Sequence, residues 1–190
     1  MALEEMLNMK ATGIVRRIDD LGRVVIPKEI RKTLKIREGN QLEIFTDRNG
    51  EIVLKKYSPI GELGAAAKQF ADSLSNVCGC TVIIVDRDSV CAATGGNKKE
   101  LIGKIISKSL EEVLMERESI LPQEGKKSIR IIEEDDYGEG YMQIVLPILW
   151  ESDVAGGVIL MPKKRDGKLE SSDEKIAKLA AEFLGKQMEN

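Results

Sequence analysis

The stretch TGIVRRIDDLGRVVIPKEIRKTLKIREGNQLEIFTDRNGEIVLKKY, residues 12–57, decides the fold of the front of this chain. Its β-branched residues have strand-like spacing over residues 12–18 and recur at residues 24–26. The residues between these two runs, 19–22, include two aspartates and a glycine, which favour a turn. We therefore expect a strand, a turn and a second strand.

A short helix and a hairpin are expected to follow. Pro27 fits the first helical position, where its missing N–H needs no partner, and residues 28–35 supply helix formers ahead of Gly39. Beyond them, apolar runs at 41–45 and 51–55 flank the sequence DRNG. Asn-Gly between two such runs is the strongest short signal for a β-hairpin. The predicted order is therefore β, β, α, β, β.

A unit of this size buries too little surface to be stable alone. The segment contains neither histidine nor cysteine, so a His-based metal site or a disulfide cannot stabilise it. Two copies that interleave their strands would share one core at low cost. We expect an obligate, intertwined dimer.

Charge is distributed unevenly along the chain. Residues 10–57 hold 12 Lys or Arg against seven acids, a net charge of +5, whereas residues 58–190 hold 17 basic and 23 acidic residues, a net charge of −6. The total of −3 conceals this asymmetry. A basic front segment is typical of a unit that binds a polyanion, and the acidic rear is expected to do something else.

Composition narrows the class of protein. Hydrophobic residues make up 42% and charged residues 32% of the chain, which is typical of a soluble globular protein. No stretch approaches the roughly 20 apolar residues of a membrane span. The first residues lack the basic and apolar regions of a signal peptide. We expect a cytoplasmic protein with no membrane role.

Chemistry is restricted by the absence of histidine, which excludes His-based triads, His metal ligands and the usual proton shuttle at neutral pH. Three cysteines, Cys78, Cys80 and Cys91, are an odd number and are expected to be reduced thiols. Cys-x-Cys without further ligands is a weak signal for zinc. We expect no enzyme, no metal and no cofactor.

The rear of the chain begins near residue 58. Ser58 and Pro59 fit the N-cap and first position of a helix over residues 59–78. Its apolar residues repeat with spacings of three and four, as in a coiled-coil seam: Ile60, Leu63, Ala67, Phe70, Leu74 and Val77. Such a stripe can pack on the helix's own domain, or it can also pair with a symmetry mate.

The rest of the rear predicts an α+β domain with an antiparallel sheet over residues 79–190. A last helix is expected from Ser171, whose spacing to Glu174 fits a capping box. Asn97 and Glu100 are placed like a capping pair ahead of an earlier helix. The expected elements are strands at 81–86, 90–94, 128–132, 141–149 and 154–161, and helices at 98–116 and from 171 onward.

Several motifs of the front segment resemble one family of regulators. They are Gly13-Ile14-Val15-Arg16, the run DLGRVVIP at 20–27, Arg31-Lys32, and the closing LKKY at 54–57. Together they resemble the AbrB-type swapped-hairpin transcription regulators. The continuation through Ser58-Pro59-Ile60 is similar to a branch of that family whose rear half is a GAF-like sensor fold.

This resemblance implies a β-barrel formed by an intertwined dimer through residues 9–58, and a tetramer built through the rear domains. It also implies duplex-DNA binding and both activation and repression of sporulation genes, with an unidentified small molecule as a further partner. The main DNA contacts would be Arg16, Arg23, Arg31 and Lys32, and Lys10, Arg17, Lys28 and Lys35 would be further contacts. A solvated basic face is the alternative interpretation of these residues.

One position departs from the family pattern. Family members often carry a second arginine where Lys32 stands, and lysine offers a point charge in place of a bidentate fork. Aromatic residues make up only 4% of the chain, which favours contacts with duplex backbone and grooves over stacking on single strands. We expect much of the selectivity to come from DNA shape.

Two other functions stay open. Some GAF-fold proteins are thiol-based reductases, so Cys78, Cys80 and Cys91 could form a redox sensor or a reductase in the rear domain. The front module also occurs in antitoxins, whose partner-binding tails are normally short and disordered. The ordered, capped helices expected here favour a regulator over an antitoxin.

Overall fold

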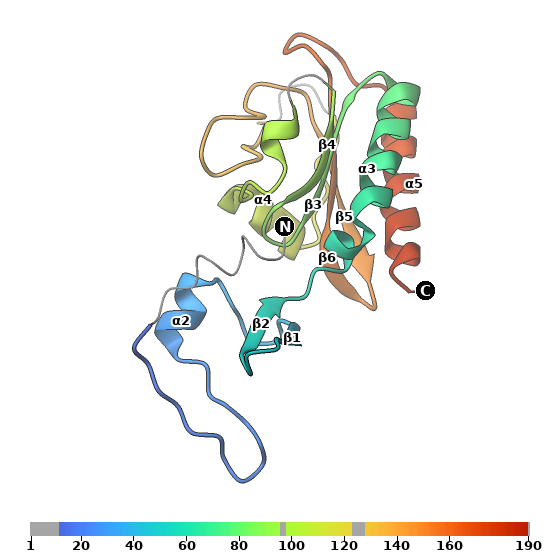
Figure 1. Cartoon of the computed structure of the whole chain (residues 1–190). Helices are drawn as coiled ribbons and strands as arrows, with labels where there is room; N and C mark the ends of the chain where they lie inside the picture. Colours follow the sequence, from blue (N-terminus) through green and yellow to red (C-terminus); the bar gives the residue numbers. More distant parts are fainter. Residues whose placement is uncertain (1–11, 96–97, 123–127, 190) are drawn as a thin grey trace. The chain divides into compact units, whose positions relative to one another are not determined.

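The computed structural model describes residues 12–95, 98–122 and 128–189, which Figure 1 shows in colour. The chain divides into two compact units, one ending at Tyr57 and the other beginning at Ser58. The fold is α+β, as predicted, and the strands pair antiparallel throughout the described ranges. In that part of the chain, no helix has both the length and the apolar character needed to cross a membrane.

The predicted hairpin forms in the front unit. Strands β1 (Leu42–Thr46) and β2 (Ile52–Lys56) pair so that Ile44 lies opposite Leu54. The Asp47 carboxylate organises the turn, because its Oδ1 accepts hydrogen bonds from the backbone N–H groups of Asn49 (3.0 Å) and Glu51 (2.8 Å). Gly50 completes it with φ 83°, a conformation in which glycine carries no penalty.

Three details of the front unit differ from the expectation. Residues 12–18 and 24–26 form the predicted turn between them but no strands, because a strand needs a hydrogen-bonded neighbour and the described part of one chain supplies none. Pro27 is the N-cap of α2 (Lys28–Thr33) and not its first residue. The helix also ends earlier than predicted, ahead of Lys35 with φ 51°.

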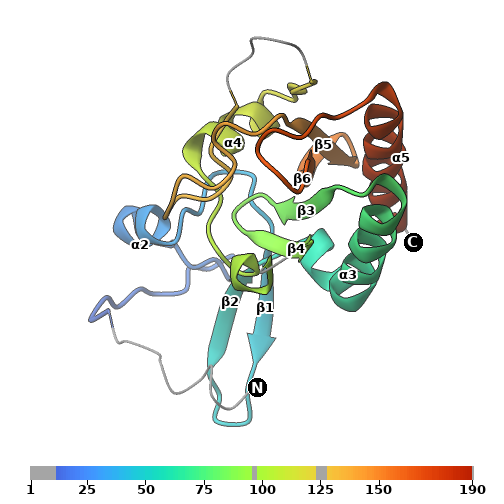
Figure 2. The same cartoon turned by 90° about the horizontal axis from the view of Figure 1, so that it is seen from above.

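The rear unit is a four-stranded sheet with helices on both faces, as Figures 1 and 2 show. Its strand order is β4 (Val90–Thr94), β3 (Thr81–Asp86), β6 (Asp153–Met161), β5 (Ile144–Trp150). Helices α3 (Pro59–Cys78) and α5 (Ser171–Gln187) cover one face, and α4 (Lys108–Met115) contacts the other. The sheet therefore separates two apolar cores.

The start of α3 follows the prediction. Ser58 is the N-cap, with its Oγ accepting the Gly61 N–H at 3.0 Å, and Pro59 is the first helical residue. Of the apolar stripe, Ile60, Ala67 and Leu74 are buried against the sheet of the same chain. The stripe thus packs on its own unit, while Val77 near its end stays 75% exposed.

The prediction of a single helix over residues 98–116 is wrong. A short 3₁₀ helix, η1 (Lys98–Leu101), is separated from α4 by Gly103 with φ 83° and by bridges that hold Ile105 and Ile106 in extended backbone. The strand predicted at 128–132 is reduced to one such bridge, between Ile106 and Ile132. Asn97, predicted to cap this helix, lies outside the described residues.

The predicted capping box of the last helix is displaced by one residue. Glu170 is the N-cap of α5, and the Asp173 Oδ2 accepts the Glu170 N–H at 2.8 Å. Asp173 therefore takes the role that Glu174 was expected to have. This local shift matters below because it fixes the orientation of a buried carboxylate.

Candidate nucleic-acid interface

The basic residues singled out in the front unit are exposed. The structure places them in two segments, the loop around residues 16–23 and the region of α2 at 28–35. The seven candidates in these segments are Arg16, Arg17, Arg23, Lys28, Arg31, Lys32 and Lys35. The eighth, Lys10, lies outside the described residues.

Within the loop, one carboxylate organises the backbone around Arg23. The Asp19 Oδ1 accepts hydrogen bonds from the N–H groups of Leu21 (3.0 Å) and Arg23 (2.8 Å). Its Oδ2 accepts from the Arg23 Nε at 2.8 Å. Gly22 closes the turn with φ 76°, and its N–H donates to the Asp19 carbonyl at 3.0 Å.

These contacts have an electrostatic consequence. The Arg23 backbone N–H, followed by its guanidinium, holds the pKa of Asp19 below the ordinary value for aspartate. The Arg23 side chain is nevertheless 69% exposed, so its remaining guanidinium N–H groups face solvent. Asp19 thus orients Arg23 while leaving it able to donate to a phosphate or a base edge.

Asp19 is the residue that the sequence interpretation missed. An acid within a basic DNA-binding loop looks unfavourable when only charge is counted. The signal that could have revealed it is its position at the start of a turn that contains Gly22, because aspartate side chains often bond to backbone N–H groups two residues further on, here that of Leu21.

The second basic segment is a single short helix. In α2, Arg31 and Lys32 occupy the last turn, where positive charge is favourable beside unpaired carbonyls. No residue of this helix is buried in one chain. A six-residue helix with no buried face has little intrinsic stability, so it needs packing from elsewhere to persist.

The front unit also exposes a large amount of apolar surface. Alternation along the paired strands puts Ile44, Leu54 and Ile52 on one face of the hairpin. Their exposed fractions are 66%, 43% and 69%, respectively. Val15, Ile18, Leu21 and Val25 in the preceding segment are also mostly exposed. Apolar surface of this extent marks an interface.

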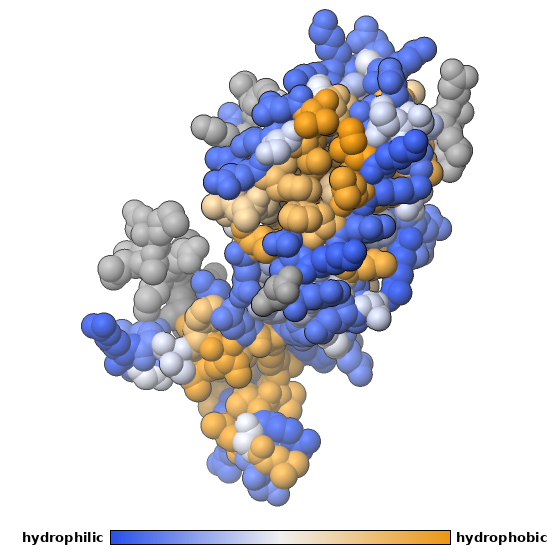
Figure 3. All heavy atoms as spheres, turned by 90° about the vertical axis from the view of Figure 1, so that its right-hand side faces the viewer, coloured by the Kyte–Doolittle hydropathy of each residue, from blue (hydrophilic) through white to orange (hydrophobic). Residues whose placement is uncertain are grey.

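A second exposed apolar area lies on α3 and α5 of the rear unit. Figure 3 looks onto this side and shows apolar side chains gathered there. Phe183 of α5 stacks on Phe70 of α3 with 4.8 Å between ring centroids, and Phe183 itself is 42% exposed. Leu179, one turn earlier on α5, is 66% exposed. We call Phe70, Val77, Leu179 and Phe183 the helix-pair patch.

The structure does not bring the three cysteines together. Cys80 immediately precedes β3, whereas Cys91 on β4 lies beside the opposite end of that strand, next to Asp86 and Ser89. Burial, with a smaller contribution from the Asp86 charge, raises the pKa of Cys91 far above its usual value. A redox centre that uses all three thiols is therefore not assembled in this fold.

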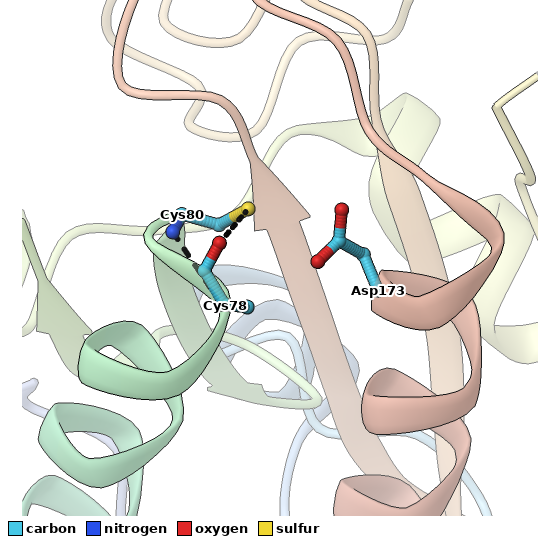
Figure 4. A group of neighbouring side chains, drawn as sticks. All are labelled: Cys78, Cys80 and Asp173. Carbon is cyan, nitrogen blue, oxygen red and sulfur yellow. Dashed lines mark hydrogen bonds between the residues drawn. The ribbon is translucent and has the colours of Figure 1, made fainter.

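The other two thiols lie close together and meet a carboxylate. Cys78 Sγ, Cys80 Sγ and a carboxylate oxygen of Asp173 lie within 4.8 Å of one another. Figure 4 shows the Asp173 carboxylate pointing toward the two cysteines. Hydrogen bonding from the Cys80 thiol lowers the pKa of Cys78 to about 6, and the same contact together with burial raises the pKa of Cys80.

Comparison with known protein families gives two matches that together span most of the chain. Residues 62–189 match the family described as stage V sporulation protein T C-terminal, transcription factor. Residues 15–62 match the family described as antidote-toxin recognition MazE, bacterial antitoxin. The boundary between the two matches lies close to the division between the front and rear units.

Individual relatives are similar to nearly the whole chain or to its front segment. Stage V sporulation protein T of Bacillus subtilis is 49% identical over 181 residues, which cover 95% of this chain and 99% of the relative. The solution structure of the N-terminal DNA recognition domain of AbrB from Bacillus subtilis is 61% identical, covering 27% of this chain and 94% of that domain, with a TM-score of 0.24.

GAF domains are among the solved structures to which the chain is similar at low sequence identity. One is the cofactor binding GAF domain of the nutrient sensor CodY from Clostridium difficile, which is 16% identical and covers 64% of this chain and 83% of that domain. Its TM-score is 0.47, and this likeness carries no argument about the fold or about a ligand.

Proposed function

Because the chain belongs to the stage V sporulation protein T family of transcription factors, we propose that it binds duplex DNA and both activates and represses sporulation genes in the cytoplasm. The expectation that it is not an enzyme agrees with this family. The observation that supports the proposal is the exposed basic loop of the front unit, in which Asp19 orients Arg23 while the Arg23 side chain stays largely exposed.

The DNA-binding form in this proposal is a dimer of front units. The apolar face of the hairpin around Ile44 is uncovered in one chain, and residues 12–18 and 24–26 have no strand partner. A second copy would satisfy both needs, because its extended segments can pair with these and cover the hairpin. The two basic loops would then be carried by one rigid body.

We further propose that rear units join two such dimers into a tetramer through the helix-pair patch. Its exposed side chains belong to two helices that already pack on one another, so the patch is a rigid surface and not a mobile loop. Effector sensing, the remaining part of the proposal, would use the other face of the sheet, where α4 lies. The two roles would then occupy opposite faces.

A substitution in the helix-pair patch tests the tetramer. Leu179→Lys should convert a tetramer into dimers, shifting the dissociation constant by about tenfold or more, because it places a charge in an apolar contact. Light scattering after size exclusion measures the mass. Met115→Lys is the matched control, since Met115 is 51% exposed on α4, across the sheet. A Leu179→Lys protein that stays tetrameric contradicts this assignment.

The DNA-binding role itself is tested by titrating promoter duplexes from the source organism with full-length protein and following fluorescence anisotropy at several salt concentrations. We expect affinity to fall on the order of tenfold or more between about 50 and 200 mM salt, because bound phosphates release counterions. If no duplex binds at the lowest salt, the front unit acts only in assembly.

A further inference from the structure

A cluster of two thiols and a carboxylate in the rear unit takes no part in the proposed DNA binding. Cys78 is the last residue of α3, and Cys80 follows after one glycine. Gly79 ends the helix with φ 67°, and Figure 4 shows the Cys80 sulfur on the side that faces α5. Asp173, in the first turn of α5, reaches the pair from a distant part of the sequence.

The spacing of these atoms suits a metal ion. Two sulfur atoms bound tetrahedrally at about 2.3 Å from Zn²⁺ lie about 3.8 Å apart, and a carboxylate oxygen at about 2.0 Å lies slightly closer. The ligand atoms of this cluster all lie within 4.8 Å of one another. Shortening these separations by about 1 Å would bring the three atoms to the spacing of a zinc site.

The carboxylate is buried and positioned. Asp173 is 8% exposed and Cys80 is 5% exposed. The Asp173 Oδ2 accepts the Glu170 N–H at 2.8 Å, which orients the carboxylate as outer hydrogen bonds orient metal ligands. Among the described residues, no lysine or arginine lies within ion-pair distance of Asp173. A metal ion bound there would pair with a carboxylate that the first turn of α5 already holds in place, near Lys163, whose charge acts on the neighbouring Cys80.

The surroundings of the two thiols also favour a bound metal ion. The Cys80 N–H points at Cys78 Sγ with a separation of 3.4 Å, and such a contact stabilises a sulfur that carries negative charge. Sulfur and carboxylate ligands in a tetrahedral arrangement are typical of zinc and not of magnesium or calcium, which prefer oxygen alone.

We propose that Cys78 Sγ, Cys80 Sγ and a carboxylate oxygen of Asp173 form a Zn²⁺ site whose fourth position is open to water. The site would connect the C-terminal end of α3 to the N-terminal end of α5. These helices carry the helix-pair patch, so the ion would fix their separation. This inference stands on the rear unit's own residues and does not depend on DNA binding.

The test uses full-length protein, reduced and freed of metal, and Co²⁺ as a spectroscopic probe. We expect a single Co²⁺ per chain to give thiolate-to-metal charge-transfer absorption and the visible bands of a tetrahedral site, and Zn²⁺ to remove both. Zn²⁺ should also raise the thermal unfolding midpoint of the wild type.

Single substitutions of the candidate ligands test which side chains bind the metal ion. Cys78→Ser and Cys80→Ser should each lose the charge-transfer band, while Cys91→Ser should keep it. Asp173→Asn retains an oxygen that can accept the Glu170 N–H, so the helix cap survives, and metal affinity should fall about tenfold or more. Thermal unfolding without metal confirms that each variant is folded.

Three results would overturn the site. The first is a wild-type protein that binds Co²⁺ without a thiolate band. The second is a band that persists in Cys78→Ser. The third is a Cys78–Cys80 disulfide, found by mass spectrometry, that forms as readily with Zn²⁺ present as without it. That last result would make the pair a redox switch in place of a metal site.

Discussion

Ile44→Asp is expected to abolish the dimer of front units and nearly all measurable DNA binding. Ile44 lies opposite Leu54 on the apolar face of the hairpin and is 66% exposed in a single chain. Covering such a side chain contributes about 1.5–3 kcal/mol, and each dimer contains two copies. The aspartate would also leave an unpaired charge in the shared core. Dimer dissociation should rise more than about a hundredfold.

Sedimentation and anisotropy on the same sample measure this effect. Asn49→Asp is the matched control, because it adds the same charge at the exposed hairpin turn and keeps a turn sequence that hairpins favour. Ile44→Val, which removes one methylene, should cost only about 1 kcal/mol and preserve the dimer. An Ile44→Asp protein that remains dimeric and binds DNA normally would show that this face stays uncovered.

The contrast between the two halves of the front unit shows what a sequence alone can predict. The hairpin at β1 and β2 was predicted correctly because its signals are local: Asn-Gly, an aspartate at the start of the turn, and alternating strands. Residues 12–18 carry an equally clear strand pattern, yet one chain provides no partner for them. In the proposed dimer their conformation would depend on a second copy, which no local pattern describes.

In the rear unit, the prediction from sequence fails for a different reason. Residues 98–116 have helical spacing of apolar residues, but Gly103 and the bridges at Ile105 and Ile106 break the helix. The bridge partner of Ile106 is Ile132, which lies in a separate segment of the chain. At these residues, tertiary contacts override the local propensity for helix.

The candidate sites follow the same rule. Arg23 was identified through a local motif, whereas Asp173 could not be, because the fold alone brings it to the Cys78 and Cys80 thiols. From the sequence alone, the two cysteines two residues apart did not predict a metal site. The third candidate ligand, Asp173, comes near the thiols because α5 packs beside α3 on the same face of the sheet.

Arg23→Ala should produce the second large effect, a loss of affinity for promoter duplex of about tenfold to a hundredfold, with the dimer intact. A guanidinium that donates to a phosphate or a base edge is worth about 1–3 kcal/mol. If its contact is a phosphate, the slope of log affinity against log salt should fall by about one. Anisotropy across several salt concentrations gives both quantities, and Arg23→Lys separates the charge from the fork.

Substitution of Asp19 tests more specifically whether this carboxylate positions Arg23 for DNA, because it has two opposing consequences. Asp19→Asn deletes a negative charge near DNA, which favours binding, but it also deletes the carboxylate that orients the Arg23 guanidinium. Asp20→Asn removes the same charge one residue away, on a side chain that is exposed. We expect Asp20→Asn to bind DNA as well as the wild type or slightly better, and Asp19→Asn to bind severalfold more weakly. Equal affinities for the two variants would mean that Arg23 reaches DNA without help from Asp19, and that the loop is organised by the duplex itself.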